Sequence, residues 1–448
     1  PPPELDQGLP WAPSGGMMPR PALASMEGKA EVALRRGPLI VMLLLITWLG
    51  FSRMMAEGLG DAIYKFGHET LRVVQAWENN GFFAWGGFFP LGNTYMPAGQ
   101  SLQSADIYQS YPPLYLLVYW PSYHFWGEPG FRVFKLVWSL SYGVGLGILL
   151  GTIASSCFTK AATGYKQLGF ASSYVMTISN QAVLRYFMID EPDYLGLFLL
   201  LLAVVLLRNH WSHPNPLSRR PWSIWMVWFF ASWTYPILGA LNFLSLFALQ
   251  RLRLTRPILS SLRRLLFPLS AGIALYWVQR LMVNVIFPAG LKGSSLYERM
   301  GLISKDTDSH RGVLDALRFL VWQMSGTSAL KSGVALSQVI EHNAIWVMGV
   351  VLFAIVFAYS RGEQRQLVLI LAAAQLWLLI PLLHQSLAHH DWIYAIHFVP
   401  TVVLGWVGAM ELFLPQRPGE IFAPWMMGFI ATLIWAIQIR FFLVAYLT

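Results

Sequence analysis

Residues 185–208 read RYFMIDEPDYLGLFLLLLAVVLLR, an acidic turn followed by an apolar run that carries no charge until Arg208. An apolar stretch of this kind is one of a series along the chain, and a helix that crosses the roughly 30 Å hydrocarbon core needs about 20 residues. The apolar runs lie near residues 38–56, 133–157, 168–188, 194–208, 222–250, 265–288, 343–360, 366–384, 392–414 and 421–447. They predict an all-α polytopic membrane protein with about 10 or 11 transmembrane helices.

Composition agrees with this class of protein. The 448 residues are 56% hydrophobic and 12% charged, whereas soluble domains average about 25% charged residues. The 20 tryptophans suit the two membrane interfaces, where indole rings collect. The net charge of +9 comes from short basic clusters between apolar runs, so it indicates membrane orientation and no nucleic-acid partner. The single Cys157 excludes a disulfide within the chain.

The basic loops predict the topology. Residues 1–37 form a flexible tail in the cytoplasm, where the native start could be Met26, and residues 38–448 form one transmembrane domain whose first span is a retained anchor. The loops predicted on the outer side are residues 57–132, 189–193, 289–342 and 385–391, and those predicted in the cytoplasm are residues 159–166, 208–220, 251–264 and 361–365. The stretch 113–126 must then be re-entrant or interfacial, and Thr234-Tyr235-Pro236 could divide the run 222–250 into a helical hairpin.

The first outer loop contains a candidate catalytic acid. Asp61 and the pair His68-Glu69 precede apolar residues at helical spacing, namely Leu71, Val74 and Trp77. This spacing predicts a short amphipathic helix on the membrane that begins beside Glu69 and ends at Gly81. A carboxylate in the first turn is stabilised by free amides and the helix dipole. Glu69 is therefore either a functional acid or a capping acid in a solvated loop.

Three carboxylates crowd the turn in the quoted stretch. Asp190, Glu191 and Asp193 lie within four positions, so they repel one another unless a cation or a donor compensates. Arg185 is one candidate, and carboxylate oxygens also suit a divalent metal ion. In the alternative interpretation these acids only cap the helix that begins at Pro192.

The long outer loop 289–342 contains basic residues that could hold a phosphate. Arg299, Lys305 and Arg311 qualify, as does Arg185 in the acidic turn, because guanidinium and ammonium groups bind phosphate through charge-assisted hydrogen bonds. The alternative for this loop is that its charges are merely solvated.

A histidine-rich segment precedes the span 392–414. It contains His389-His390-Asp391, and His390, Tyr394 and His397 fall on one helical face. The group could bind a transition metal, although it lacks a recognised motif such as His-Glu-x-x-His, or it could line a substrate site.

The order of these features resembles the GT-C superfamily of membrane glycosyltransferases, in particular the bacterial family 39-like branch related to protein mannosyltransferases and aminoarabinose transferases. The resemblance spans residues 38–410 and begins with the long first outer loop and its acidic residue. It further rests on four segments, which are Tyr111-Pro112-Pro113-Leu114-Tyr115, the acidic turn Arg185 to Asp193, the break Thr234-Tyr235-Pro236 and the segment His389 to Pro400. It implies a GT-C-like bundle with interfacial helices in a long first outer loop. It also implies sugar transfer from a polyprenyl-phosphate donor to an acceptor on the extracytoplasmic face.

The resemblance assigns roles to the candidate residues. Glu69 or Asp61 would be the general base, and Asp190 or Glu191 would position the acceptor or a cation. Candidate substrate-binding residues are His68, Tyr111, Tyr115, Arg185, Arg299, Lys305, His389, His390, Asp391 and Tyr394. The implied location is a bacterial inner or plasma membrane, with membrane lipids and complex subunits as partners and a divalent metal left undecided.

Two other functions stay open. The family commonly has an Asp-Glu pair where this chain has His68-Glu69, so the protein could be a catalytically silent GT-C-like subunit of a larger membrane complex. A transporter or lipid flippase is the third hypothesis. The sequence shows no internal repeat of paired broken helices, which many transporters contain.

Overall fold

The computed structural model describes the parts of the chain that position the candidate site. These are residues 60–85, 89–90, 107–108, 114–157, 163–180, 183, 192–211, 222–249, 255–286, 291–292, 336–360, 363–373, 395–413, 426, 429–438 and 440. All of them belong to the unit Leu49–Thr448. The predicted tail 1–37 and the first predicted span lie outside the described residues.

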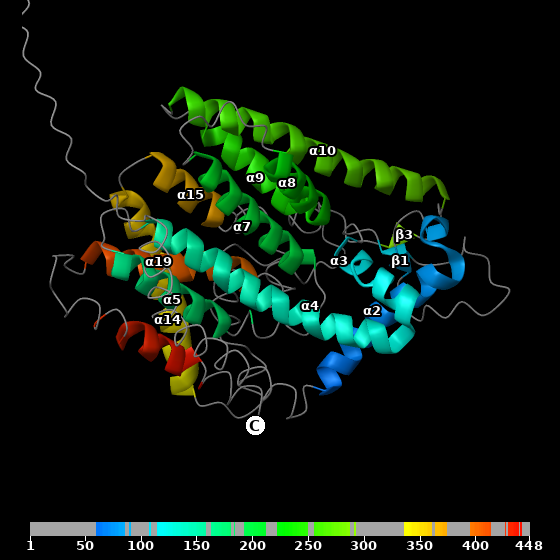
Figure 1. Ribbon diagram of the computed structural model, residues 1–448, viewed down its shortest axis with the longest axis horizontal. Helices are drawn as coiled ribbons and strands as arrows, with labels where there is room; N and C mark the ends of the chain where they lie inside the picture. Colours follow the sequence, from blue (N-terminus) through cyan, green and yellow to red (C-terminus); the bar gives the residue numbers. More distant parts are fainter. Residues whose placement is uncertain are drawn as a thin grey trace, which may run out of the picture. The chain divides into compact units, whose positions relative to one another are not determined.

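Helices form nearly all of the described structure, as predicted for an all-α protein (Figure 1). The longer helices are α2 (Gly60–Asn80), α4 (Trp120–Cys157), α5 (Thr163–Ile178), α7 (Pro192–Trp211), α8 (Trp222–Thr234), α9 (Pro236–Leu249), α10 (Arg256–Ile286), α14 (Leu336–Tyr359), α15 (Glu363–Ala373) and α19 (Val399–Phe413). The short elements are the helices η1 (Phe82–Trp85), α3 (Leu114–Leu117) and η3 (Ala395–Phe398) and the strands β1 (Phe89–Pro90), β2 (Ile107–Tyr108) and β3 (Leu291–Lys292).

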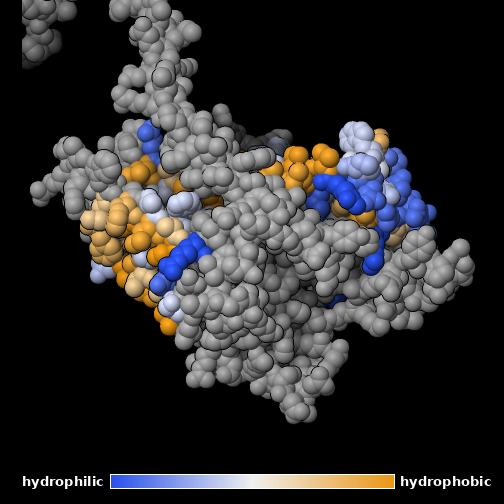
Figure 2. Space-filling view, turned by 90° about the horizontal axis from the view of Figure 1, so that it is seen from below, coloured by the Kyte–Doolittle hydropathy of each residue, from blue (hydrophilic) through white to orange (hydrophobic). Residues whose placement is uncertain are grey.

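Four of the described helices are long and apolar enough to cross a membrane. They are Trp120–Ser156, Asp193–Trp211, Ile258–Val285 and Ile396–Phe413. Shorter apolar helices, Pro236–Phe247, Asn343–Tyr359 and Phe429–Gln438, lie within other predicted runs. Large hydrophobic side chains are exposed on the described residues (Figure 2), as expected for surfaces that face lipid. These features support a multi-pass membrane protein, while the total number of spans and the side of the N-terminus stay predictions.

Helix α10 begins earlier than the sequence indicated. The predicted cytoplasmic loop 251–264 is helical from Arg256 onward, because Pro257 occupies the first turn, where a missing amide N–H breaks no hydrogen bond. Helix α4 likewise begins at Trp120, inside the stretch predicted to be re-entrant, and is interrupted at Gly127, whose φ is +63°. The residues before Gly127 thus form a separate helical segment.

Helix α2 ends where the sequence predicted but begins much earlier. Gly81 terminates it at φ +82°, and its amide donates to the Trp77 carbonyl oxygen at 2.8 Å. The start at Gly60 places Glu69 in the helix interior, so the predicted first-turn stabilisation of Glu69 is wrong, because the preceding residues also adopt helical geometry. Asp61 occupies the first turn instead. The apolar face is buried as expected, with Leu71, Val74 and Trp77 in the core.

Helices α8 and α9 form the predicted hairpin. A Cβ added to Gly239 would lie 2.9 Å from the Cα of Ser232, although an uninterrupted helix would hold these positions about 10 Å apart. The chain therefore reverses at Tyr235, and Pro236 begins the second helix. Both helices pack on α10, beside which they lie in Figure 1.

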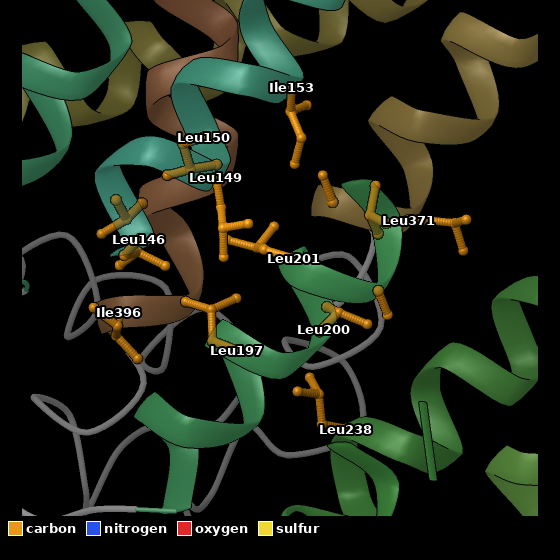
Figure 3. Packing of buried hydrophobic residues seen from close by; sticks show 14 of the residues in the cluster. Leu146, Leu149, Leu150, Ile153, Leu197, Leu200, Leu201, Leu238, Leu371 and Ile396 are labelled. Carbon is orange, nitrogen blue, oxygen red and sulfur yellow. The ribbon is translucent and has the colours of Figure 1, made fainter. Parts of the chain in front are cut away.

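The core is built from leucine-rich helix faces. Figure 3 shows Leu146, Leu149, Leu150 and Ile153 of α4, Leu197, Leu200 and Leu201 of α7, Leu238 of α9, Leu371 of α15 and Ile396 of η3. Lipid tails are as apolar as leucine, so membrane helices associate through close packing and polar contacts. Both occur around α19. Its Gly405 leaves no room for a side chain against the carbonyl oxygen of Gly349 on α14, and its Glu411 pairs with Arg365 of α15.

A small sheet joins the two predicted outer loops. Strand β2 pairs with β1 in antiparallel orientation and with β3 in parallel orientation. Strands β1 and β2 belong to the loop 57–132, and β3 belongs to the loop 289–342. Backbone pairing requires both loops to lie on one side of the membrane, which supports their predicted common side.

Candidate functional site

A buried carboxylate–imidazole contact marks the candidate site. Nε2 of His397 lies 2.9 Å from Oδ1 of Asp193, and neither side chain has any exposed surface. Asp193 is in the first turn of α7, and His397 is in η3, immediately before α19. Ionisable groups are costly to bury away from water, so a fully buried pair of this kind is a functional-site candidate.

Tyr235 completes the cluster from the turn between α8 and α9. Its ring stacks on the imidazole of His397, with centroids 5.5 Å apart and an interplanar angle of 9°. Gly196 of α7 allows Tyr235 to lie close to that helix, because a Cβ at position 196 would lie 2.9 Å from the Cβ of Tyr235. We refer to Asp193, Tyr235 and His397 as the Asp193 cluster.

Three proline-marked helix starts converge on the Asp193 cluster. Helix α7 begins at Pro192, α9 begins at Pro236, and α19 begins one residue before Pro400. Proline favours the first helical positions, and the first amides of a helix present a positive end. The first turn of α7 therefore presents its free amides beside the side chain of Asp193.

Several oxygen atoms near the cluster are buried without a partner among the described residues. They include Oδ2 of Asp193, Oγ1 of Thr234 beside Tyr235, and Oγ1 of Thr401, one helical turn after His397. A buried polar atom normally finds a hydrogen bond to protein or water. Asp193 thus keeps one oxygen that can accept a hydrogen bond from a water molecule or from the hydroxyl group of a ligand.

Aromatic side chains connect the cluster to α4. The ring centroids of Tyr194, next to Asp193, and Tyr142 of α4 are 4.8 Å apart. Tyr142 also contacts Phe198 edge-on, with centroids 5.1 Å apart. Tyr115 of α3 and Trp77 of α2 are buried in the same hydrophobic core as Tyr142 and Tyr194. Helix α3, which carries Tyr115, contacts α7 and α8, and α2 contacts α3 and α4. The Tyr115 segment therefore packs on the helices that carry Asp193 and lead to Tyr235.

Four of the predicted site residues fall on described elements. Asp61, His68 and Glu69 lie on α2, where only the backbone is described for them, and Tyr115 is a buried core residue of α3. The other ten, which are Tyr111, Arg185, Asp190, Glu191, Arg299, Lys305, His389, His390, Asp391 and Tyr394, lie outside the described residues. Their roles stay predictions.

Sequence reasoning noticed each member of the Asp193 cluster without assigning it to the site. Asp193 was one of three crowded acids, Tyr235 was part of a helix break, and His397 shared a helical face with His390 and Tyr394. The signal that could have joined them is the proline beside each helix start. Sequence alone could not show that the three starts meet.

No metal centre is evident in the described part of the chain. It contains no group of three or more His, Cys, Asp or Glu side chains placed to hold a metal ion. Asp193 and His397 offer one oxygen and one nitrogen ligand, which is fewer than metal sites ordinarily use. Asp190, Glu191 and the segment His389 to Asp391, at which the sequence left a metal undecided, lie outside the described residues.

Comparisons with known proteins add no assignment. None of the protein-family models, curated proteins or solved structures compared with this chain matches it.

Proposed function

We propose that the protein is a membrane glycosyltransferase that moves a sugar from a polyprenyl-phosphate donor to an acceptor on the extracytoplasmic face. The contact between Asp193 and His397 carries this proposal. It joins the end of the acidic turn 185–193 to the histidine-rich segment 389–400, and Tyr235 adds the helix break. Three of the four segments on which the GT-C resemblance rests thus each contribute one residue to the same cluster.

The proposed reaction requires a carboxylate base and positive charge near the lipid phosphate. An inverting displacement at the anomeric carbon needs a base on the side opposite the leaving phosphate and positive charge at that phosphate. In this proposal Glu69 or Asp61 supplies the base from α2, and Asp190 or Glu191 positions the acceptor or a cation. Helix α2 packs on α3, and α3 packs on α7, which supports an approach of the first loop to the start of α7.

The position of the cluster favours an enzyme over a transporter. Asp193 is the first residue of the candidate span Asp193–Trp211, and His397 is the second residue of the span Ile396–Phe413. Transporters usually bind substrate and coupling ions near the middle of the bilayer. A polar cluster at the ends of two spans instead suits chemistry at the membrane surface.

Transfer of labelled sugar tests the proposal. Membranes with matched amounts of wild-type, Glu69→Gln, Asp61→Asn or Asp190→Asn protein are supplied with radiolabelled polyprenyl-phosphate sugars, and label in the acceptor is measured. We expect transfer by the wild type and a loss of about 100-fold or more in at least one variant, since general acid–base groups contribute 10²–10⁴-fold. Glu128→Gln, which removes an exposed carboxylate of α4, is the matched control and should retain transfer.

A wild-type protein that transfers no sugar from any pool would overturn the proposal. Co-purification of such a protein in a stable membrane complex would then favour the catalytically silent subunit. Equal transfer by wild type, Glu69→Gln and Asp61→Asn would retain the enzyme but refute the assigned base.

A further inference from the structure

Helix α10 carries an arginine without a carboxylate partner among the described residues. Arg280 lies within the candidate span Ile258–Val285, in the last two turns of the helix. Its Nη1 donates to the Tyr276 hydroxyl oxygen at 3.2 Å, and its Cζ lies 5.5 Å from the centre of the Trp277 ring. Neither group carries a negative charge, so the described residues hold the guanidinium in place without neutralising it.

Arg280 belongs to a polar row on α10. Tyr276, Arg280 and Asn284 recur every four residues and share one helix face. Oδ1 of Asn284 is one of several buried side-chain atoms without a hydrogen-bond partner among the described residues. This oxygen can only accept a hydrogen bond, whereas the N–H groups of the same amide can donate to an anion. On the neighbouring helix α8, Nε1 of Trp233 donates to Oε1 of Gln279 at 2.6 Å and fixes this end of α10.

The polar row borders a surface that faces lipid. Trp277, Leu281 and Val285 form the adjacent row, and they are 46%, 61% and 82% exposed. In a membrane protein, apolar side chains this exposed on a spanning helix contact lipid. Helix α10 is about 46 Å long, which exceeds the roughly 30 Å hydrocarbon core, so its end reaches the headgroup layer.

The charge of Arg280 therefore needs an anion that arrives from the lipid side. A guanidinium binds phosphate through two parallel hydrogen bonds, and tryptophan beside it suits the interface between hydrocarbon and headgroups. The anion available along a lipid-facing helix end is the phosphate group of a membrane lipid. We propose that Arg280, with the amide of Asn284 beside it, binds the phosphate of an anionic phospholipid. This site does not depend on the proposed sugar transfer.

Lipid binding to the purified full-length chain tests the assignment. The protein is exchanged into nanodiscs with increasing phosphatidylglycerol in phosphatidylcholine, and bound lipid is counted by native mass spectrometry. We expect Arg280→Gln to weaken phosphatidylglycerol binding about tenfold or more, because it removes the charge-assisted hydrogen bonds to the phosphate. Arg280→Lys keeps the positive charge but loses the planar guanidinium group that can donate two parallel hydrogen bonds. Its affinity for phosphatidylglycerol should therefore lie between those of the wild type and Arg280→Gln. Arg132→Gln is the matched control, because Arg132 already pairs with Glu128.

Equal binding by wild type and Arg280→Gln, or equal losses in Arg280→Gln and Arg132→Gln, would overturn the assignment. If Arg280→Gln does not fold, Arg280→Lys and Tyr276→Phe provide the test, and unchanged binding in both would overturn it too. A polyprenyl phosphate that displaces phosphatidylglycerol from the wild type at equal concentration would overturn the choice of a phospholipid.

Discussion

Burying Asp193 and His397 side by side removes two ionisable groups from water, and their contact offsets part of that cost. Removal of one partner of a buried pair leaves the other unpaired, which is usually more destabilising than the pair was stabilising. The stacked Tyr235 ring and the first turn of α7 add to the positioning of both groups. The loss of stability on mutation should therefore depend on whether the substituted residue can still form a hydrogen bond with its partner.

We expect His397→Ala to lower stability by about 3–5 kcal/mol, because it leaves the Asp193 carboxyl buried without its imidazole partner. Asp193→Asn should be milder, because the amide oxygen of asparagine can still accept the hydrogen bond from Nε2. Thermal unfolding in detergent, followed by tryptophan fluorescence, measures both shifts. Glu128→Gln breaks an exposed ion pair, 41% exposed at the acid, and should cost no more than about 1 kcal/mol. A midpoint for His397→Ala equal to that of Glu128→Gln would show that the buried contact contributes little.

At the scale of the helix, the end of α2 depends on the left-handed conformation of Gly81. No atom lies within 4 Å of a Cβ added there, so backbone conformation alone decides which residues are tolerated. We expect Gly81→Ala to destabilise the protein by about 1–2 kcal/mol, and Gly81→Asn to destabilise it less, because asparagine adopts this conformation more readily. Thermal midpoints of the two variants give the comparison. An alanine variant as stable as the asparagine variant would contradict this account of the helix end.

The attachment of α2 to the beginning of α4 should depend on pH. Glu78 accepts hydrogen bonds from Nε1 of Trp120 at 2.9 Å and from Nδ1 of His124 at 2.9 Å, and the first of these is the main reason that the pKa of Glu78 falls below its usual value of 4.5. A carboxyl with a lowered folded-state pKa contributes its full stabilisation above its usual, unfolded-state pKa. This contribution disappears as the pH falls through the lower folded-state value.

The variant Glu78→Gln tests this dependence. Its thermal midpoint should lie below that of the wild type at pH 7, and the difference should shrink as the pH is lowered from 5 towards 3. Arg132→Gln, which leaves Glu78 in place, should show no such convergence with the wild type. A wild-type-to-Glu78→Gln difference that is constant across this range would rule out an ionised Glu78 as the cause.

At the scale of the whole molecule, the direction of each helix determines which helix ends lie on the same side of the membrane. Helix α7 ends at Trp211 and α8 begins at Trp222, so the connection between them lies at the end opposite Asp193. The hairpin at Tyr235 returns the chain, and α10 then leads to β3 on the side of the Asp193 cluster. Residues 212–221 and the residues after β3 should therefore lie on opposite sides of the membrane.

Cysteine labelling measures this arrangement. Cys157 is the single cysteine, so Cys157→Ser provides a background without thiols. In that background we expect Ser218→Cys and Ser294→Cys to react with a membrane-impermeant maleimide from opposite sides of sealed vesicles. The positive-inside rule further predicts that position 218 reacts from the cytoplasmic side, because Arg219 and Arg220 adjoin it. Labelling of both positions from one side would contradict the helix order.

Much of the fold followed from local sequence. The apolar runs near 194–208 and 392–414 became α7 and α19 because a long apolar segment in a bilayer must satisfy its own backbone as a helix. Gly81 and Pro236 marked real helix boundaries for reasons of backbone geometry. Helix starts were less well predicted, as at Gly60 and Arg256, because the polar residues there are compatible with both loop and helix.

The sequence by itself determined that this is a helical membrane protein, since hydrophobic length and loop charge act locally along the chain. It also indicated the acidic turn, the helix break and the histidine-rich segment as separate features. Only the tertiary structure decided that Asp193, Tyr235 and His397 meet, and that Arg280 stands beside lipid-facing side chains. Those relations depend on how helices far apart in sequence pack against each other, and that packing is set by close contacts such as those of Gly196 with Tyr235 and Gly405 with Gly349.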